Sequence, residues 1–140
     1  RLPLCALVLA VGAWAGGGLW QRWQADRERA QAQALVESSG PSPRALALLE
    51  RSARRVDHPE TARLAGLIEA SLAGDQPVDA ARLRAAAADF ERAARRNPFR
   101  ASTWSMLEII YRRSGREDLA RSARARGAAF CPSLRDHAAP

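Results

Sequence analysis

Side chains able to catalyse a reaction or to bind a metal are few in this chain, and they lie far apart. His58 precedes a proline and His137 lies near the C-terminus, so neither has a cysteine or a second histidine at metal-ligand spacing. Cys131 has no neighbouring base that would activate its thiol. No glycine-rich phosphate-binding loop is present. We therefore predict no catalytic, cofactor-binding or metal site, and the sequence favours a protein without enzymatic activity.

Arginine supplies all of the positive charge. The chain has 22 basic and 15 acidic side chains, a net charge of +7, and every basic residue is arginine, with pairs at Arg54-Arg55, Arg95-Arg96 and Arg112-Arg113. Nucleic-acid binding would require exposed aromatic rings beside these arginines, whereas the aromatics fall at apolar helical positions and acidic residues are interspersed. The pattern favours an acidic protein partner or anionic lipid head groups over nucleic acid.

The first twenty residues form an uncharged segment. Leu2 to Trp20 run for 19 residues without a charge. A helix of that length spans about 28 Å, close to the hydrocarbon thickness of a bilayer. Trp20 and Trp23 lie at the end of this segment, with arginines beyond them, as at a membrane boundary. The sequence therefore predicts a transmembrane helix over residues 1–20.

Two other interpretations of this segment stay open. Leu2–Val11 followed by Ala13-Trp14-Ala15 also resembles a signal peptide with its cleavage site. Because the chain starts at Arg1 and not at Met, the segment is alternatively the last helix of a longer polytopic protein. Gly12 and Gly16 have the G-x-x-x-G spacing through which two membrane helices associate, which predicts a homo-oligomer.

Beyond the first segment the sequence predicts helices only. Its length suggests one small domain, and with 47% hydrophobic residues a disordered chain is excluded. Apolar residues recur at helical spacing between short breaks rich in proline, glycine and aspartate. We expect a charged helical stalk and linker over 21–42, a helical domain over 43–132 and a tail over 133–140. Within the domain we expect helices at 43–56, 60–73, 79–96, 101–114 and 117–129.

An internal repeat is suggested by the last two of these helices. Trp104, Leu107 and Tyr111 have the spacing W-x2-L-x3-Y, and the pattern continues with Gly115, Ala120 and Pro132. In this register the segment resembles a tetratricopeptide repeat, a helix–turn–helix unit of 34 residues.

The preceding segment supports the resemblance at the same offset. Pro98 pairs with Pro132, Ala86 with Ala120 and Ala93 with Gly127, and Phe90 takes an aromatic position. The resemblance covers residues 43–132 and is strongest from residue 80 onward. It implies an all-α fold, in which a short solenoid of helical hairpins follows the N-terminal transmembrane helix.

The resemblance also implies a place for a partner. Such repeats bind partners in a concave groove lined by the first helix of each pair. The matching outward positions are Ser102, Ser105, Ile109, Arg112 and Arg113. The two arginines could hold a carboxylate, such as the C-terminus or an acidic segment of a partner protein.

Together these features predict a membrane-anchored scaffold for protein–protein interaction in bacterial envelope assembly. We expect it in the bacterial inner membrane, with a single visible span and the soluble domain in the periplasm, although the positive-inside rule alone would place the arginines in the cytoplasm. An alternative is the periplasmic C-terminal tail of a polytopic O-antigen ligase or O-oligosaccharyltransferase, which this architecture resembles. A third is an exported repeat protein released at Ala15.

Overall fold

The protein folds into α-helices, which confirms the predicted all-α class. A computed structural model describes residues 2–75 and 78–131, with side chains from residue 17 onward, and the described part contains no strand. Its six helices are α1 (Leu2–Ser39), α2 (Pro43–Arg55), α3 (Pro59–Leu72), α4 (Ala80–Arg96), α5 (Ala101–Arg113) and α6 (Glu117–Phe130).

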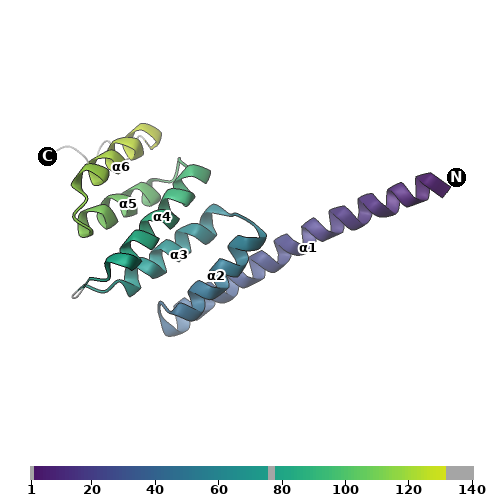
Figure 1. Ribbon diagram of the computed structural model, residues 1–140, viewed down its shortest axis with the longest axis horizontal. Helices are drawn as coiled ribbons and strands as arrows, with labels where there is room; N and C mark the ends of the chain where they lie inside the picture. The colour runs from purple at the N-terminus through teal and green to yellow at the C-terminus, as the bar shows by residue number, and fades with distance from the viewer. Residues whose placement is uncertain (1, 76–77, 132–140) are drawn as a thin grey trace.

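The helices lie side by side in the order of the chain. Each packs mainly against the helix before it and the helix after it, and short turns make neighbours antiparallel (Figure 1). The result is a row of helices in which α1 extends well beyond α2 (Figure 1). Contacts local in sequence therefore dominate the fold.

Local signals fix where the helices begin. The side chain of Ser42 accepts from the backbone N–H of Ala45 at 3.3 Å, and Nδ1 of His58 accepts from that of Glu60 at 3.2 Å. Asp79 caps α4 in the same way. These side chains satisfy N–H groups that have no partner within the first helical turn. His58 thus has a structural role at the start of α3.

Two apolar clusters hold the row together. The larger extends from α3 to α6 and contains the fully buried Phe90 together with Leu83, Leu107 and Ile110. The smaller joins the C-terminal half of α1 to α2 and α3 through Ala32, Leu49 and their neighbours. The described residues that carry the repeat pattern inside helices are all buried, namely Ala86, Phe90, Ala93, Trp104, Leu107, Tyr111, Ala120 and Gly127.

Helices α3 and α4 lie close together at Gly66. A Cβ atom placed on this residue would lie 2.7 Å from Cδ2 of Phe90 and 3.2 Å from the carbonyl oxygen of Ala86. The ring of Phe90 occupies the volume that any other side chain at position 66 would need. The packing of α3 against α4 therefore requires glycine at position 66.

Residues 21–39, expected to form a stalk, pack along α2 in the structure. Ala25 and Ala32 are buried in this contact. The hydroxyl of Ser52 donates to the carbonyl oxygen of Ala25 at 2.9 Å, and Arg55 lies 3.4 Å from Glu28. Because alanines form the buried face, α1 comes close to α2, and the segment has no obvious apolar stripe in its sequence.

The prediction of a transmembrane helix over residues 1–20 is wrong. None of the helices of the described residues is both long enough and apolar enough to cross a membrane. A helical span needs about 20 consecutive apolar residues. Among the described residues, α1 continues past residue 20 into a charged stretch that contains Arg22 and Asp26 to Arg29. The prediction of a location in the bacterial inner membrane, with one span and a periplasmic domain, depends on that helix and is therefore wrong as well.

Three further predictions concern residues outside the described set. The side chains around Gly12 and Gly16, on which the predicted homo-oligomer rests, are not described, and neither is the cleavage site ending at Ala15. Pro132 and the tail to residue 140 also lie outside it. Gly115 is described and occupies the turn between α5 and α6 with a φ of 71°.

Candidate functional site

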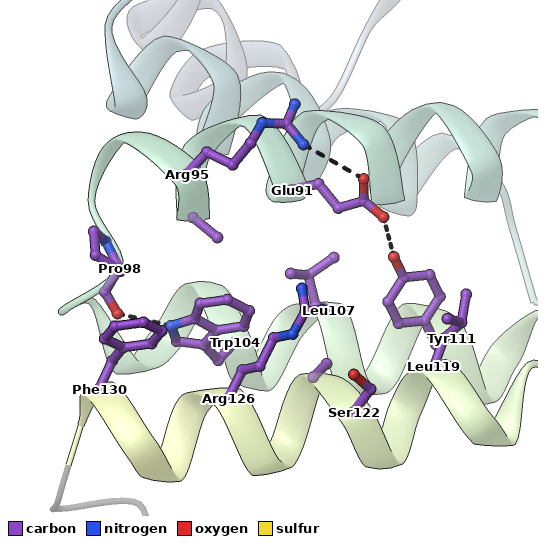
Figure 2. A pocket seen from close by; sticks show the side chains of 12 residues that line it. Glu91, Arg95, Pro98, Trp104, Leu107, Tyr111, Leu119, Ser122, Arg126 and Phe130 are labelled. Carbon is purple, nitrogen blue, oxygen red and sulfur yellow. Dashed lines mark hydrogen bonds and ion pairs between the residues drawn. The ribbon is translucent and has the colours of Figure 1, made fainter.

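A groove lies between α4 and α6, and α5 forms its floor. We call it the α4–α6 groove; its volume is about 590 Å³. Figure 2 shows its lining side chains, which come from all three helices. They are Glu91, Ala94, Arg95, Pro98, Trp104, Leu107, Tyr111, Leu119, Ser122, Ala123, Arg126 and Phe130.

The floor of the groove follows from helical spacing. Trp104, Leu107 and Tyr111 are three and four residues apart, so they lie on one face of α5. Both α4 and α6 pack on α5. At Ala94 and Ala123 the two walls carry only a methyl group. Because the wall side chains at these two positions are small and the floor side chains are large, open space remains above the aromatic rings.

One end of the groove is aromatic. The indole N–H of Trp104 donates to the carbonyl oxygen of Pro98 at 2.7 Å, which fixes the ring. Phe130 stacks on it, with ring centroids 6.1 Å apart and planes 9° from parallel. Phe99 meets Phe130 edge to face at 6.1 Å and is 74% exposed. This end offers a rigid apolar surface that water reaches.

The other end is polar. The hydroxyl of Tyr111 donates to the carboxylate of Glu91, and Arg95 lies 3.7 Å from the same carboxylate (Figure 2). Burial, together with this hydrogen bond, raises the pKa of Tyr111 to about 12. Tyr111 therefore stays neutral at physiological pH and acts as a donor, not as a base.

The charges on the lining leave the groove positive. Arg126 extends from α6 across the groove toward the side of α4 (Figure 2). Two arginines, Arg95 and Arg126, therefore face a single carboxylate, that of Glu91. A ligand that carries a negative charge would meet a favourable field there.

A second groove lies on another flank of α4. We call it the α2–α4 groove; α3 forms its floor, and its volume is about 330 Å³. Its lining residues are Leu46, Leu49, Glu50, Ala53, Thr61, Ala65, Glu69, Ala85, Ala88, Asp89 and Arg92. Three carboxylates face one arginine in this set, so its charge is opposite to that of the α4–α6 groove.

Asp89 is the most perturbed carboxyl group of the α2–α4 groove. Burial raises its pKa to about 6, and the carboxylates of Glu69 and Glu50 act in the same direction. Arg92, 2.7 Å away, opposes the rise. Desolvation of the charged carboxylate thus outweighs its stabilisation by Arg92. The ionised form of Asp89 therefore destabilises the folded protein.

The pH dependence of folding should report this destabilisation. A folded-state pKa above the ordinary 3.8 means that the native protein holds the proton more tightly than the unfolded chain. The associated stability is present below about pH 4 and is lost as pH rises through about 6. We expect the wild type to lose about 2 kcal/mol over this window relative to Asp89→Asn. Urea unfolding at pH 4, 5, 6 and 7 measures the difference.

The variant Asp118→Asn is a matched control for this comparison. Asp118 is an exposed carboxylate on α6, outside the lining of either groove. Asp118→Asn should follow the wild-type pH profile. If Asp89→Asn follows it as well, burial does not penalise the Asp89 carboxylate.

The partner-binding residues predicted from the sequence lie on α5 but line neither groove. They are Ser102, Ser105, Ile109, Arg112 and Arg113. Ile109 is exposed on the side of α5 turned away from the aromatic floor. This placement does not test their predicted role, which stays a prediction.

The two arginines of that set have acceptors within the protein. Arg112 lies 2.7 Å from Glu108. Arg113 reaches the end of α3, where it donates to the carbonyl oxygens of Ala70, at 3.4 Å, and of Gly74, and lies 3.1 Å from Asp75. Arg113 therefore ties α5 to the α3–α4 turn.

Sequence reasoning missed most of the groove lining. It identified Trp104, Leu107 and Tyr111 as core positions, but it did not predict an open space above them. Phe130, at the last position of α6, extends the α6 wall, and a large aromatic at a helix end is the one signal that could have pointed there. The opposing walls belong to helices about 30 residues apart in the chain.

The described residues show neither a metal-binding cluster nor an exposed thiol. They contain no group of three or more histidine, cysteine, aspartate or glutamate side chains arranged for a metal ion. Cys131 is buried, with its Sγ 3.6 Å from the carbonyl oxygen of Pro98. Its thiol thus packs at the end of α6 and does not face the groove.

No protein-family model matches this chain, and no curated protein is significantly similar to it. The comparisons therefore identify no tetratricopeptide repeat, and no described helix supports the prediction of a membrane protein. What remains established is a row of helices with two grooves of opposite charge.

Proposed function

We propose that this protein is a protein-interaction module that binds a short acidic and apolar segment of a partner protein in the α4–α6 groove. The observation that carries the proposal is the pairing of a fixed aromatic floor with an excess of arginine on the walls. Aromatic residues and arginine are the residue types most enriched at the energetic centres of protein interfaces.

The size and chemistry of the groove suit such a segment. A volume of about 590 Å³ accommodates a few side chains. Phe130 and Trp104 provide a surface for an apolar side chain, and Arg126 provides a charged hydrogen-bond donor for a carboxylate.

A display library of random peptides, selected on the purified protein, tests the proposal. Enriched peptides should combine an aromatic or aliphatic residue with aspartate or glutamate. Arg126→Gln should weaken the best peptide about tenfold, as expected for losing one charge-assisted contact. The measurement is fluorescence anisotropy with the labelled peptide.

Two further variants locate the binding. Arg121→Gln is the matched control, because Arg121 is also on α6 but lines neither groove and pairs with the exposed Asp118. It should change affinity by less than about twofold. Ser122→Trp should block the groove from its wall without altering the buried core. Failure of the library to enrich any peptide, or full binding by Ser122→Trp, would overturn the proposal.

A further inference from the structure

The α2–α4 groove contains polar atoms that the protein itself leaves unsatisfied. Oγ1 of Thr61 is buried and has no hydrogen-bond partner among the described residues, and the same holds for Nε of Arg92. Thr61 is only 1% exposed. Buried polar groups normally have partners, because leaving one unpaired costs free energy. Two such atoms in the lining of one groove point to a ligand that supplies the partners.

The carboxylates of the groove are only partly compensated. Asp89 pairs with Arg92 at 2.7 Å, and Glu69 pairs with Arg82 at 3.0 Å. Glu50 is 3.9 Å from Arg54, and both of these side chains are largely exposed. Arg82 and Arg54 act from outside the groove lining. The lining itself therefore carries three carboxylates and one arginine, and only Asp89 pairs with that arginine.

The acceptors and the donor that line this groove require different partners. Carboxylates and the Thr61 oxygen accept hydrogen bonds, so they suit a cation with several N–H donors. The Nε–H of Arg92 is a donor and needs an oxygen acceptor. A basic residue within a peptide supplies both, a charged side chain and a main-chain carbonyl oxygen.

The form of the groove favours this cation over a metal ion. No three of its carboxylates are arranged to hold a metal among the described residues. Carboxylates spread over three helices suit the wide, planar donor set of a guanidinium group better than a small ion. Leu46, Leu49 and Ala65 line the groove beside them and offer apolar contact for the aliphatic stem.

We propose that the α2–α4 groove binds an arginine side chain of a peptide, with its guanidinium among Glu50, Glu69 and Asp89. A main-chain carbonyl of the same peptide accepts from Nε of Arg92. This site lies on a different flank of α4 from the α4–α6 groove, and the proposal does not depend on the function assigned to that groove.

The proposal makes binding sensitive to pH. The groups facing the Asp89 carboxylate are Arg92 on its own helix, Glu69 on α3 and Glu50 on α2. Burial raises the pKa of Asp89 to about 6, so at pH 5 this carboxyl group is protonated in most of the molecules. A cation should therefore bind more weakly at pH 5 than at pH 7.

The test is a titration of the full-length protein with N-acetyl-arginine amide, followed by amide chemical shifts. N-acetyl-leucine amide is the uncharged control. The arginine compound should shift Thr61, Ala65, Ala85 and Ala88 in a saturable way at pH 7, and about fivefold more weakly at pH 5. The leucine compound should not.

Three variants and one control make the result decisive. Glu50→Gln removes a largely exposed carboxylate and should fold normally while weakening binding, and Asp89→Asn should weaken it further. Thr61→Val should weaken binding through loss of the hydroxyl, whereas Asp118→Asn should have no effect. Equal shifts with the leucine compound, no saturation, or unchanged affinity in both Glu50→Gln and Asp89→Asn would overturn the proposal.

Discussion

Phe90→Ala is expected to destabilise the protein by about 4 kcal/mol. Phe90 is fully buried in the larger cluster, against α3 on one side and α5 on the other. Removing the ring loses its transfer free energy and leaves a cavity that the helices cannot close, because Ala86 and Ala87 already lie close by. Chemical unfolding, followed by far-ultraviolet circular dichroism, measures the loss.

Two companion variants make this result interpretable. A small domain has a total stability of roughly 5–15 kcal/mol, so Phe90→Ala could leave too little folded protein to measure. Phe90→Leu keeps most of the volume and should cost about 1–2 kcal/mol, which stays measurable. Phe99→Ala removes the same ring from an exposed position and should change stability by less than about 0.5 kcal/mol. Equal losses at positions 90 and 99 would contradict the described core.

Gly66→Ala is expected to destabilise the protein by about 2 kcal/mol, against the trend for glycine inside helices. By helix propensity alone the change should stabilise by up to about 1 kcal/mol. The new Cβ, however, would lie 2.7 Å from the ring of Phe90, which is buried and cannot move away. Overpacking of this kind typically costs about 1–3 kcal/mol and outweighs the propensity gain. Urea unfolding of the variant and the wild type measures the difference.

Two further variants test this prediction, one as a control and one as a rescue. Gly18 lies in α1, and a Cβ atom added there would have nothing within 4 Å, so Gly18→Ala should be neutral or slightly stabilising. Phe90→Leu in the Gly66→Ala background should cost less than Phe90→Leu alone, because the smaller side chain relieves the overlap. Additive effects of the two substitutions would show that positions 66 and 90 do not touch.

Helix α4 contributes lining residues to both grooves. Its residues 91, 94 and 95 line the positive groove, and its residues 85, 88, 89 and 92 line the negative one. Substitutions on one flank of α4 therefore offer internal controls for binding on the other. The Arg126→Gln variant should leave the arginine compound bound in the α2–α4 groove, and Glu50→Gln should leave the peptide bound in the α4–α6 groove.

The helices after residue 42 could be predicted closely from the sequence because their limits are local. Pro43 and Pro59 occupy first helical positions, Asp79 caps α4, and Gly115 adopts the positive φ that ends α5. Each signal acts within a few residues of itself. The all-α class and the burial of the apolar helical positions followed from the same periodicity.

The N-terminal segment shows where such reasoning fails. An uncharged run predicts a membrane span, and the polar helix after it predicts a solvated stalk. In the structure, that helix packs against α2 through the buried Ala25 and Ala32, and the hydroxyl of Ser52 donates to the carbonyl oxygen of Ala25. A face made of alanine gives little periodic signal, because its stabilising effect comes from close approach to a partner helix.

The sequence by itself determined the helices after residue 42, their approximate limits and most of the residues that they bury, since these depend on local propensity and spacing. Only the tertiary structure decided that Gly66 receives the ring of Phe90, that Thr61 Oγ1 and Arg92 Nε lack partners, and that two grooves of opposite charge flank α4. These features depend on how far apart neighbouring helices lie. That distance is set by side chains on two or three helices at once, and no single segment of the sequence contains it.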